Sequence, residues 1–164
     1  MRFILTMAVI LSLTGCAGQN FSGWFESEQE KADAVMEEIF EACKNEDTEK
    51  ISELFSESAR EQIGNLDEEV SAFFSYIEGD LKSFEGDCAS SGENSQGRKK
   101  TELCGMYHLT TSEEKYCLNF YLYARDDENE ENTGLYKIEI AAEADVQQED
   151  FIWDNPEIGV FVGG

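Results

Sequence analysis

The sequence predicts an α+β fold in which N-terminal helices pack on a curved antiparallel sheet. Apolar residues recur every three or four positions between residues 26 and 79, and at every second position in several segments after residue 82. Helices followed by a run of strands are typical of the α+β class. The 164 residues, 41% of them hydrophobic and 12% aromatic, suffice for one core, which excludes a purely disordered acidic chain.

Four helical segments are predicted in the first half of the chain: 26–44, 48–55, 58–64 and 67–79. The first carries a single apolar stripe that includes Val35, Ile39 and Phe40. Side chains that can cap a helix N-terminus precede the other three, and we expect Thr48, Ser58 and Asp67 to serve in this role.

The second half of the chain alternates as strands do. The predicted strands are 82–89, 106–109, 116–123, 136–141 and 151–162, the first of them weak and the last kinked at Asn155-Pro156. A tight turn at 112–115 and a longer loop at 126–133 join the three central strands. A stretch rich in Ser, Gly and Asn follows the first strand and is expected to be a loop.

The N-terminus has the features of an export signal. A short basic start, Met1-Arg2, precedes an apolar run, Phe3 to Leu13, which is too short to span a bilayer. The run ends in Leu13-Thr14-Gly15-Cys16, which resembles the lipobox of bacterial lipoproteins. That resemblance implies a signal peptide over 1–15, lipidation at Cys16, and a flexible tether over 16–25 that carries one α+β domain, 26–164. The implied location is the extracytoplasmic side of a bacterial cell membrane, held by a lipid anchor.

The net charge of −24 limits the partners. A surface this acidic repels phosphate backbones, so nucleic acid is excluded as a partner. Anionic lipid headgroups would repel it as well, so the domain is expected to hang off the membrane rather than lie on it.

Several stretches also resemble a family of small bacterial lipoproteins of unknown function. They are Lys44-Asn45-Glu46-Asp47 through Leu54-Phe55-Ser56, Gly134-Leu135-Tyr136, Trp153, and Gly159-Val160-Phe161-Val162. The resemblance runs from Glu26 to the C-terminus and implies a cone fold like that of nuclear transport factor 2, in the cystatin superfamily. Such a fold wraps a curved sheet around a long helix and leaves a pocket at its open end.

No group of residues predicts catalysis. Alternation places His108, the only histidine, with Cys104 and Met106 on the face opposite the apolar one. The acidic run 126–132 lacks the glycine and the closing glutamate of a calcium loop, so we interpret it as a solvated hairpin loop. The basic cluster 98–100 is interpreted as local neutralisation of charge. No cofactor is indicated, and no metal site, since no cysteine pair has CxxC or zinc-site spacing.

The cysteines after the anchor leave the disulfide pairing open among Cys43, Cys88, Cys104 and Cys117. If the 112–115 turn sets the register, Cys104 and Cys117 are six residues apart along the ladder and cannot be bonded. Cys88 and Cys104 are expected to be neighbours.

The predicted function is binding: a lipid-anchored module for a small apolar or amphipathic ligand or for an envelope protein. Alternation suggests that Tyr107, Phe120 and Tyr136 share one face and, with Trp153, line an apolar pocket, unless these rings are core. One alternative is a cone-fold enzyme, an isomerase or hydrolase. The other is an interaction module that uses the face of Met106, Tyr121 and Tyr123.

Overall fold

The computed structural model describes residues 28–163. The signal peptide, Cys16 and the tether expected over 1–25 therefore lie outside the described residues. Four helices come first in the chain: α1 (Glu28–Asn45), α2 (Thr48–Leu54), α3 (Glu57–Gln62) and α4 (Leu66–Tyr76). The first long helix was predicted within two residues of its observed bounds.

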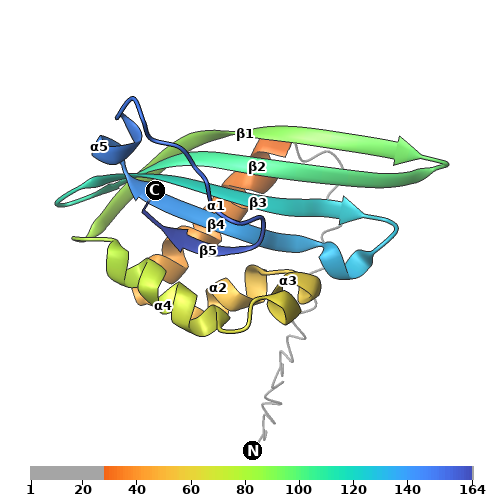
Figure 1. Ribbon diagram of the computed structural model, residues 1–164, viewed down its shortest axis with the longest axis horizontal. Helices are drawn as coiled ribbons and strands as arrows, with labels where there is room; N and C mark the ends of the chain where they lie inside the picture. Colours follow the sequence, from red (N-terminus) through yellow and green to blue (C-terminus); the bar gives the residue numbers. More distant parts are fainter. Residues whose placement is uncertain (1–27, 164) are drawn as a thin grey trace, which may run out of the picture.

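The strands form one five-stranded sheet in the order β1-β2-β3-β4-β5. They are β1 (Leu81–Ser95), β2 (Arg98–Thr111), β3 (Lys115–Asp126), β4 (Gly134–Ala142) and β5 (Gly159–Val162). The first four strands pair antiparallel, and β5 pairs parallel with β4. The predicted α+β class, with N-terminal helices packed against a mostly antiparallel sheet, is confirmed (Figure 1).

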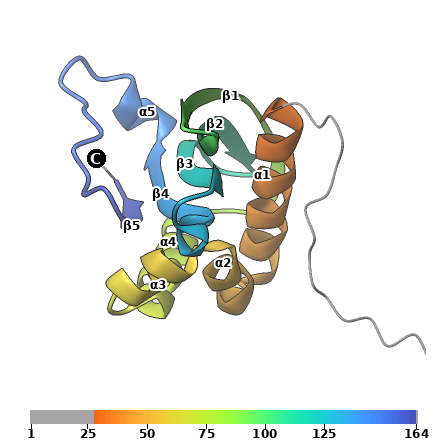
Figure 2. The same cartoon turned by 90° about the vertical axis from the view of Figure 1, so that its right-hand side faces the viewer.

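Helices α1 to α4 pack on one face of the sheet, here called the inner face. Figure 2 shows α1 on one side of the sheet, and α5 (Glu143–Val146) with the C-terminal segment on the other. Buried apolar side chains of the helices meet the alternating apolar residues of the strands. The largest fully buried ones are Phe55, Phe73, Phe120, Met36, Ile39, Ile51, Leu103, Leu109, Leu118, Leu135, Ile138 and Ile140. This core fixes which side chains remain on the opposite, outer face.

The helix caps differ from the predicted ones. Asp47 caps α2 and Ser56 caps α3, each by accepting a hydrogen bond from a backbone N–H three residues later. At the start of α4, Asn65 occupies the N-cap position without a side-chain cap. The predictions of Thr48, Ser58 and Asp67 were thus wrong by one or two residues, because several neighbouring residues in each segment are competent caps.

Two strand predictions also need correction. The stretch rich in Ser, Gly and Asn is not a loop: β1 continues through it to Ser95, and the chain reverses only at Gln96-Gly97. Both turn residues have positive φ, 52° and 85°, as a two-residue turn between twisted strands requires. The expected last strand over 151–162 is reduced to β5, and residues 147–158, here called the crossover, connect α5 to it.

Candidate functional site

Tyr107 and Phe120, two of the four predicted pocket residues, lie in the core on the inner face. Their side chains are almost fully buried, and the rings stack with centroids 5.7 Å apart. Each lies against a cross-strand glycine. Gly86 pairs with Tyr107, and Gly105 with Phe120. A Cβ built on Gly105 would meet the Phe120 ring at 2.3 Å, so these rings fill the space above the glycines and line no cavity.

The Tyr107 hydroxyl makes the polar contact that burial of a tyrosine requires. It donates to Asp33 Oδ1 of α1 at 2.8 Å. Burial, with the carboxylate of Asp33 beside it, raises the pKa of Tyr107. This contact ties α1 to the sheet and gives Tyr107 a structural role.

Tyr136 lies on the outer face, so the expectation that it shares a face with Phe120 was wrong. The register of β3 and β4 shifts between Tyr121 and Leu122, where the partners change from Lys137 to Leu135 and Tyr136 is left as the extra residue. Such a bulge turns one side chain to the other face. Trp153 lies in the crossover and packs edge-on against Phe151. The structure therefore does not bring the four residues together.

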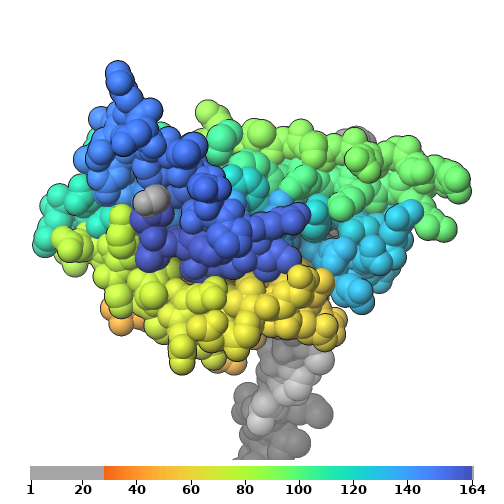
Figure 3. All heavy atoms as spheres, in the orientation of Figure 1, coloured from red at the N-terminus to blue at the C-terminus, as the bar shows by residue number. Residues whose placement is uncertain are grey.

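Four half-buried or exposed apolar side chains gather on the outer face instead. We call Met106, Tyr121, Tyr123 and Tyr136 the tyrosine patch. Tyr123 stacks on Tyr136 with centroids 5.0 Å apart, and Tyr121 lies 6.1 Å from Tyr136. Met106 is 45% exposed. In the orientation of Figure 3, which faces the outer side, the C-terminal part covers the β4 side, while much of β1–β3 remains open.

Charged side chains border the patch. Lys100 lies over the Tyr123 ring at 4.2 Å, and Lys137 over the Tyr121 ring at 4.5 Å. Tyr136 donates its hydroxyl to Glu102. Burial, together with this carboxylate, raises the pKa of Tyr136. The rings are thus fixed in orientation by contacts at both their faces and their hydroxyls.

Beside the patch, Glu139 is fully buried beneath the crossover. Lys137 Nζ lies 2.9 Å from one of its oxygens, which also accepts from Asn155 Nδ2 at 3.2 Å. The other oxygen accepts from Tyr121 at 3.0 Å and from Asn119 at 3.4 Å. Four donors contact this one carboxylate, and the contact from Asn155 fixes the crossover to the sheet.

The sequence hinted at Glu139 only through the alternation of Lys137 and Glu139 with Ile138 and Ile140, which places both charges on the outer face. That the carboxylate is buried depends on the crossover, whose path the alternation does not reveal.

His108 lies on the outer face, as alternation predicts, and has two close neighbours. Its Nδ1 is 3.7 Å from Cys117 Sγ and 3.4 Å from Glu143 Oε1. Both neighbours face the same ring nitrogen. A nucleophile–base–acid relay requires the ring to accept a proton from the thiol at one nitrogen while it donates to the carboxylate from the other. This arrangement therefore does not form such a relay. Burial and the charge of Glu143 also raise the pKa of Cys117, which favours the unreactive thiol.

The four cysteines of the described residues are free thiols. Cys104 and Cys117 are not bonded, as predicted, but the ladder offset between them is four residues rather than six, because Cys117 pairs with His108 and Cys104 with Tyr121. Cys88 pairs with Gly105 and lies one position from the pair that contains Cys104, so the two side chains lie on opposite faces of the sheet. Cys43 is buried in α1, which raises its pKa to about 12.

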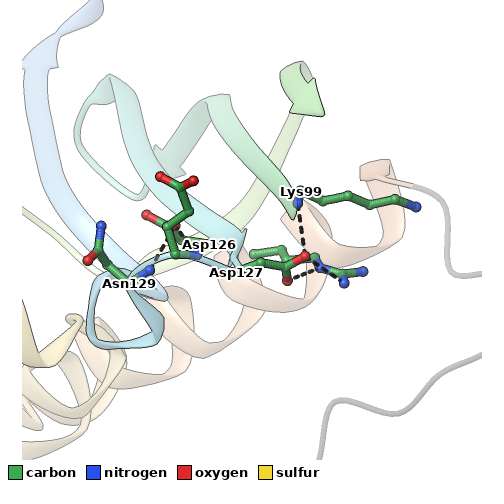
Figure 4. A network of polar contacts seen from close by, with 6 residues as sticks. Lys99, Asp126, Asp127 and Asn129 are labelled. Atoms are coloured by element: carbon green, nitrogen blue, oxygen red, sulfur yellow. Dashed lines mark hydrogen bonds and ion pairs between the residues drawn. The ribbon is translucent and has the colours of Figure 1, made fainter. Parts of the chain in front are cut away.

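The acidic loop 126–133 uses its first carboxylates for its own structure (Figure 4). Asp126 accepts from Asn132 Nδ2 and from the backbone N–H groups of Glu128 and Asn129. These contacts, the one from Asn132 foremost, outweigh the opposing effect of burial and lower the pKa of Asp126. Asp127 binds the Arg125 guanidinium and the Lys99 backbone N–H. Residues 28–163 contain no cluster of three His, Cys, Asp or Glu arranged to hold a metal.

Two open hollows lie elsewhere. One, of about 710 Å³, lies between α2, α3 and α4 and is lined by Glu49, Glu53, Arg60 and Asp67 among others. The second, of about 410 Å³, lies between the β2–β3 turn and α5, where Glu143 borders it. Both are open and lined mainly by polar residues, and neither contains a predicted pocket residue.

The protein is an α+β domain whose outer face carries aromatic and polar side chains. These features define a class of fold rather than an activity. A family model described as a domain of unknown function, DUF5104, matches residues 38–144, and the chain belongs to this family. Among proteins with curated descriptions, the chain has no significant match. The match covers α1 to α5 in part or whole and includes Met106, Tyr121, Tyr123 and Tyr136, so the tyrosine patch lies within the family domain.

Proposed function

We propose that the protein is an extracytoplasmic lipoprotein, anchored to a bacterial cell membrane through Cys16, that binds a protein of the cell envelope with its tyrosine patch. The anchor rests on the sequence Leu13-Thr14-Gly15-Cys16 at the end of the apolar run. Within residues 28–163, no helix is long and apolar enough to cross a membrane. A lipidated cysteine supplies attachment without a spanning helix.

The cone-like relationship to nuclear transport factor 2 is part of this proposal. The long helix α1 packs on the inner face of β1 and β2, as the helix of a cone does. The arrangement differs at the far edge, where β5 joins β4 in parallel. A cone built in this way has the tyrosine patch outside, on the face away from α1.

The exposed Met106, on the same face as three ordered tyrosines, carries the assignment of binding. Tyrosine and methionine are enriched at protein interfaces, because they bury large areas and still offer polar contacts. The patch is an open strand face, which suits a protein partner better than an enclosed small ligand. The raised pKa of Cys117 argues against the enzymatic alternative, since a reactive nucleophile needs the opposite shift.

Replacing Cys16 by Ser tests the anchor. The variant should leave the membrane fraction or accumulate with its signal uncleaved, because the acyl chains have no thiol to attach to. Cys88→Ser, which changes a free thiol within the domain, is the matched control and should remain in the membrane fraction. A Cys16→Ser protein that is processed and still partitions into detergent would show that the anchor lies elsewhere.

A photo-reactive amino acid at Met106 tests the binding surface. In intact cells it should give a discrete cross-linked product with an envelope protein, because its side chain is the exposed one on the β2 side of the patch. The same probe at Glu61, exposed on α3 at the helical side, should not give that product. Identical products from both positions, or none from position 106, would contradict the proposal.

A further inference from the structure

β1 forms one of the two edges of the sheet, since it is first in the strand order (Figure 1). The register with β2 is uninterrupted from Ser83 to Ser95. The backbone N–H of Cys88 points away from β2, because it donates to Gln29 Oε1 of α1 at 2.9 Å. In an antiparallel pair the direction alternates, so Ser90, Gly92 and Asn94 also direct their N–H and C=O groups outward.

Helix α1 covers only the first part of this edge. Gln29 satisfies Cys88, and Glu28, the first described residue, accepts a hydrogen bond from the Ser90 hydroxyl. Beyond this point, residues 91–95 are exposed. No backbone hydrogen bond from the outward groups of Ser90, Gly92 or Asn94 is present among the described residues. We call residues 90–94 the open edge.

Among residues 28–163, the open edge lacks the features that usually prevent strand addition. Proteins protect edges with Lys, Pro, bulges or a covering segment. Residues 89–95 read Ala-Ser-Ser-Gly-Glu-Asn-Ser, with neither Lys nor Pro, and the one irregularity of β1 lies at its other end, between Leu81 and Ser83. Small side chains leave the backbone accessible to another strand.

Carboxylates of β1 and α1 lie beside the open edge, and the basic residues of the paired strand lie opposite its end: Arg98 faces Ser95, Lys99 faces Asn94 and Lys100 faces Glu93. Arg98 is paired with Glu128, and Lys100 lies over the Tyr123 ring. Asp87 lies on the outer face three residues before the open edge, Glu93 lies on that face within it, and Glu28 lies beside it on the inner face. Asp87 and Glu93 are six residues apart, roughly 20 Å along the strand. A second copy of this chain would bring the same carboxylates against one another, whereas a strand with lysine or arginine at alternate positions would place its cations beside them.

We propose that the open edge of β1 binds an extended, cationic segment of a partner protein, which adds to the sheet as a sixth strand. Backbone hydrogen bonds to Ser90, Gly92 and Asn94 supply the attachment, and Asp87 and Glu93 select basic side chains. This surface is separate from the tyrosine patch, and the inference does not depend on the patch.

A labelled, end-capped Lys-Val-Lys-Val-Lys-Val-Lys peptide, titrated against the full chain in non-ionic detergent, tests the proposal. Binding measured by fluorescence anisotropy should weaken as salt is added, and the Glu-for-Lys peptide should not bind. Gly92→Pro should weaken binding about tenfold. The substitution removes one outward N–H, and the proline ring takes up space that the added strand would occupy. Gly92→Ala is the matched control: its Cβ would come no closer than 3.8 Å to Lys100 O, and it should bind as the unmodified protein does.

Modified probes make the test independent of any change in the protein. N-methylation of the lysines blocks one edge of the peptide, and N-methylation of the valines blocks the other. Strand addition predicts that only one of the two methylated peptides loses binding. Equal effects of both, or of neither, would overturn the proposal, because they would mean that side chains alone are recognised.

The charge assignment is tested by Asp87→Asn with Glu93→Gln. This pair should weaken binding of the lysine peptide about fivefold, as expected for two exposed ion pairs. Glu57→Gln with Glu61→Gln removes the same charge from α3 and should have little effect. Equal losses from both pairs would overturn the proposal, and so would a dimer of the chain that Gly92→Pro abolishes, since it would identify a second copy as the occupant.

Discussion

At the scale of single residues, Glu139 is the side chain on which the outer face depends most. It is fully buried, and its two oxygens accept from Asn119, Tyr121 and Asn155 and pair with Lys137. Replacing it by Gln removes the charge and directs an amide donor at groups that are themselves donors. The free energy of unfolding should fall by about 3 kcal/mol in urea titrations, as when one member of a buried ion pair is removed.

Glu113→Gln is the matched control, because Glu113 is exposed in the β2–β3 turn. It should change the free energy of unfolding by less than about 0.5 kcal/mol. If Glu139→Gln were as harmless as the control, the carboxylate would not fix the crossover to the sheet.

At the scale of elements, the sequence predicts those features of the helices and strands that depend on the local periodicity of apolar residues. The inner faces of β2 and β3 follow from the alternation of residues such as Tyr107, Leu109 and Leu118, and the side assigned to His108 is confirmed. The bulge that turns Tyr136 outward cannot be recognised from the alternation of apolar and polar residues. It inserts one residue between two parts of the strand, each of which alternates regularly.

The remaining elements are set by contacts that are distant in sequence. The polar stretch 89–95 extends as a strand because the Gln96-Gly97 turn pairs it with β2, although its composition is that of a loop. β5 lies parallel to β4 because the crossover returns it to the sheet edge, where Glu69 of α4 accepts from the Val160 N–H. The candidate site could not be predicted as a whole, since both the bulge and the crossover form it.

At the scale of the whole molecule, the charge of −24 opposes compaction. There are 36 acidic residues and only 12 Lys and Arg, and the ion pairs of the described residues, apart from Lys137–Glu139, lie at partly or fully exposed sites. Exposed pairs stabilise little, whereas the repulsion acts over a Debye length of about 30 Å at 0.01 M salt and about 10 Å at 0.1 M. The folded state therefore gains more from screening than the expanded unfolded chain does.

The free energy of unfolding should rise by on the order of 1 kcal/mol between 0.02 and 0.5 M NaCl, measured by urea titration at each salt concentration. A variant with Glu53→Lys and Glu61→Lys, both at exposed helical positions, tests the cause. It changes the charge from −24 to −20, since each substitution adds two positive units. This variant should be the more stable protein at low salt and should gain less from added NaCl, because less repulsion remains to be screened. Equal gains in the two proteins would mean that salt acts through the solvent rather than through the net charge.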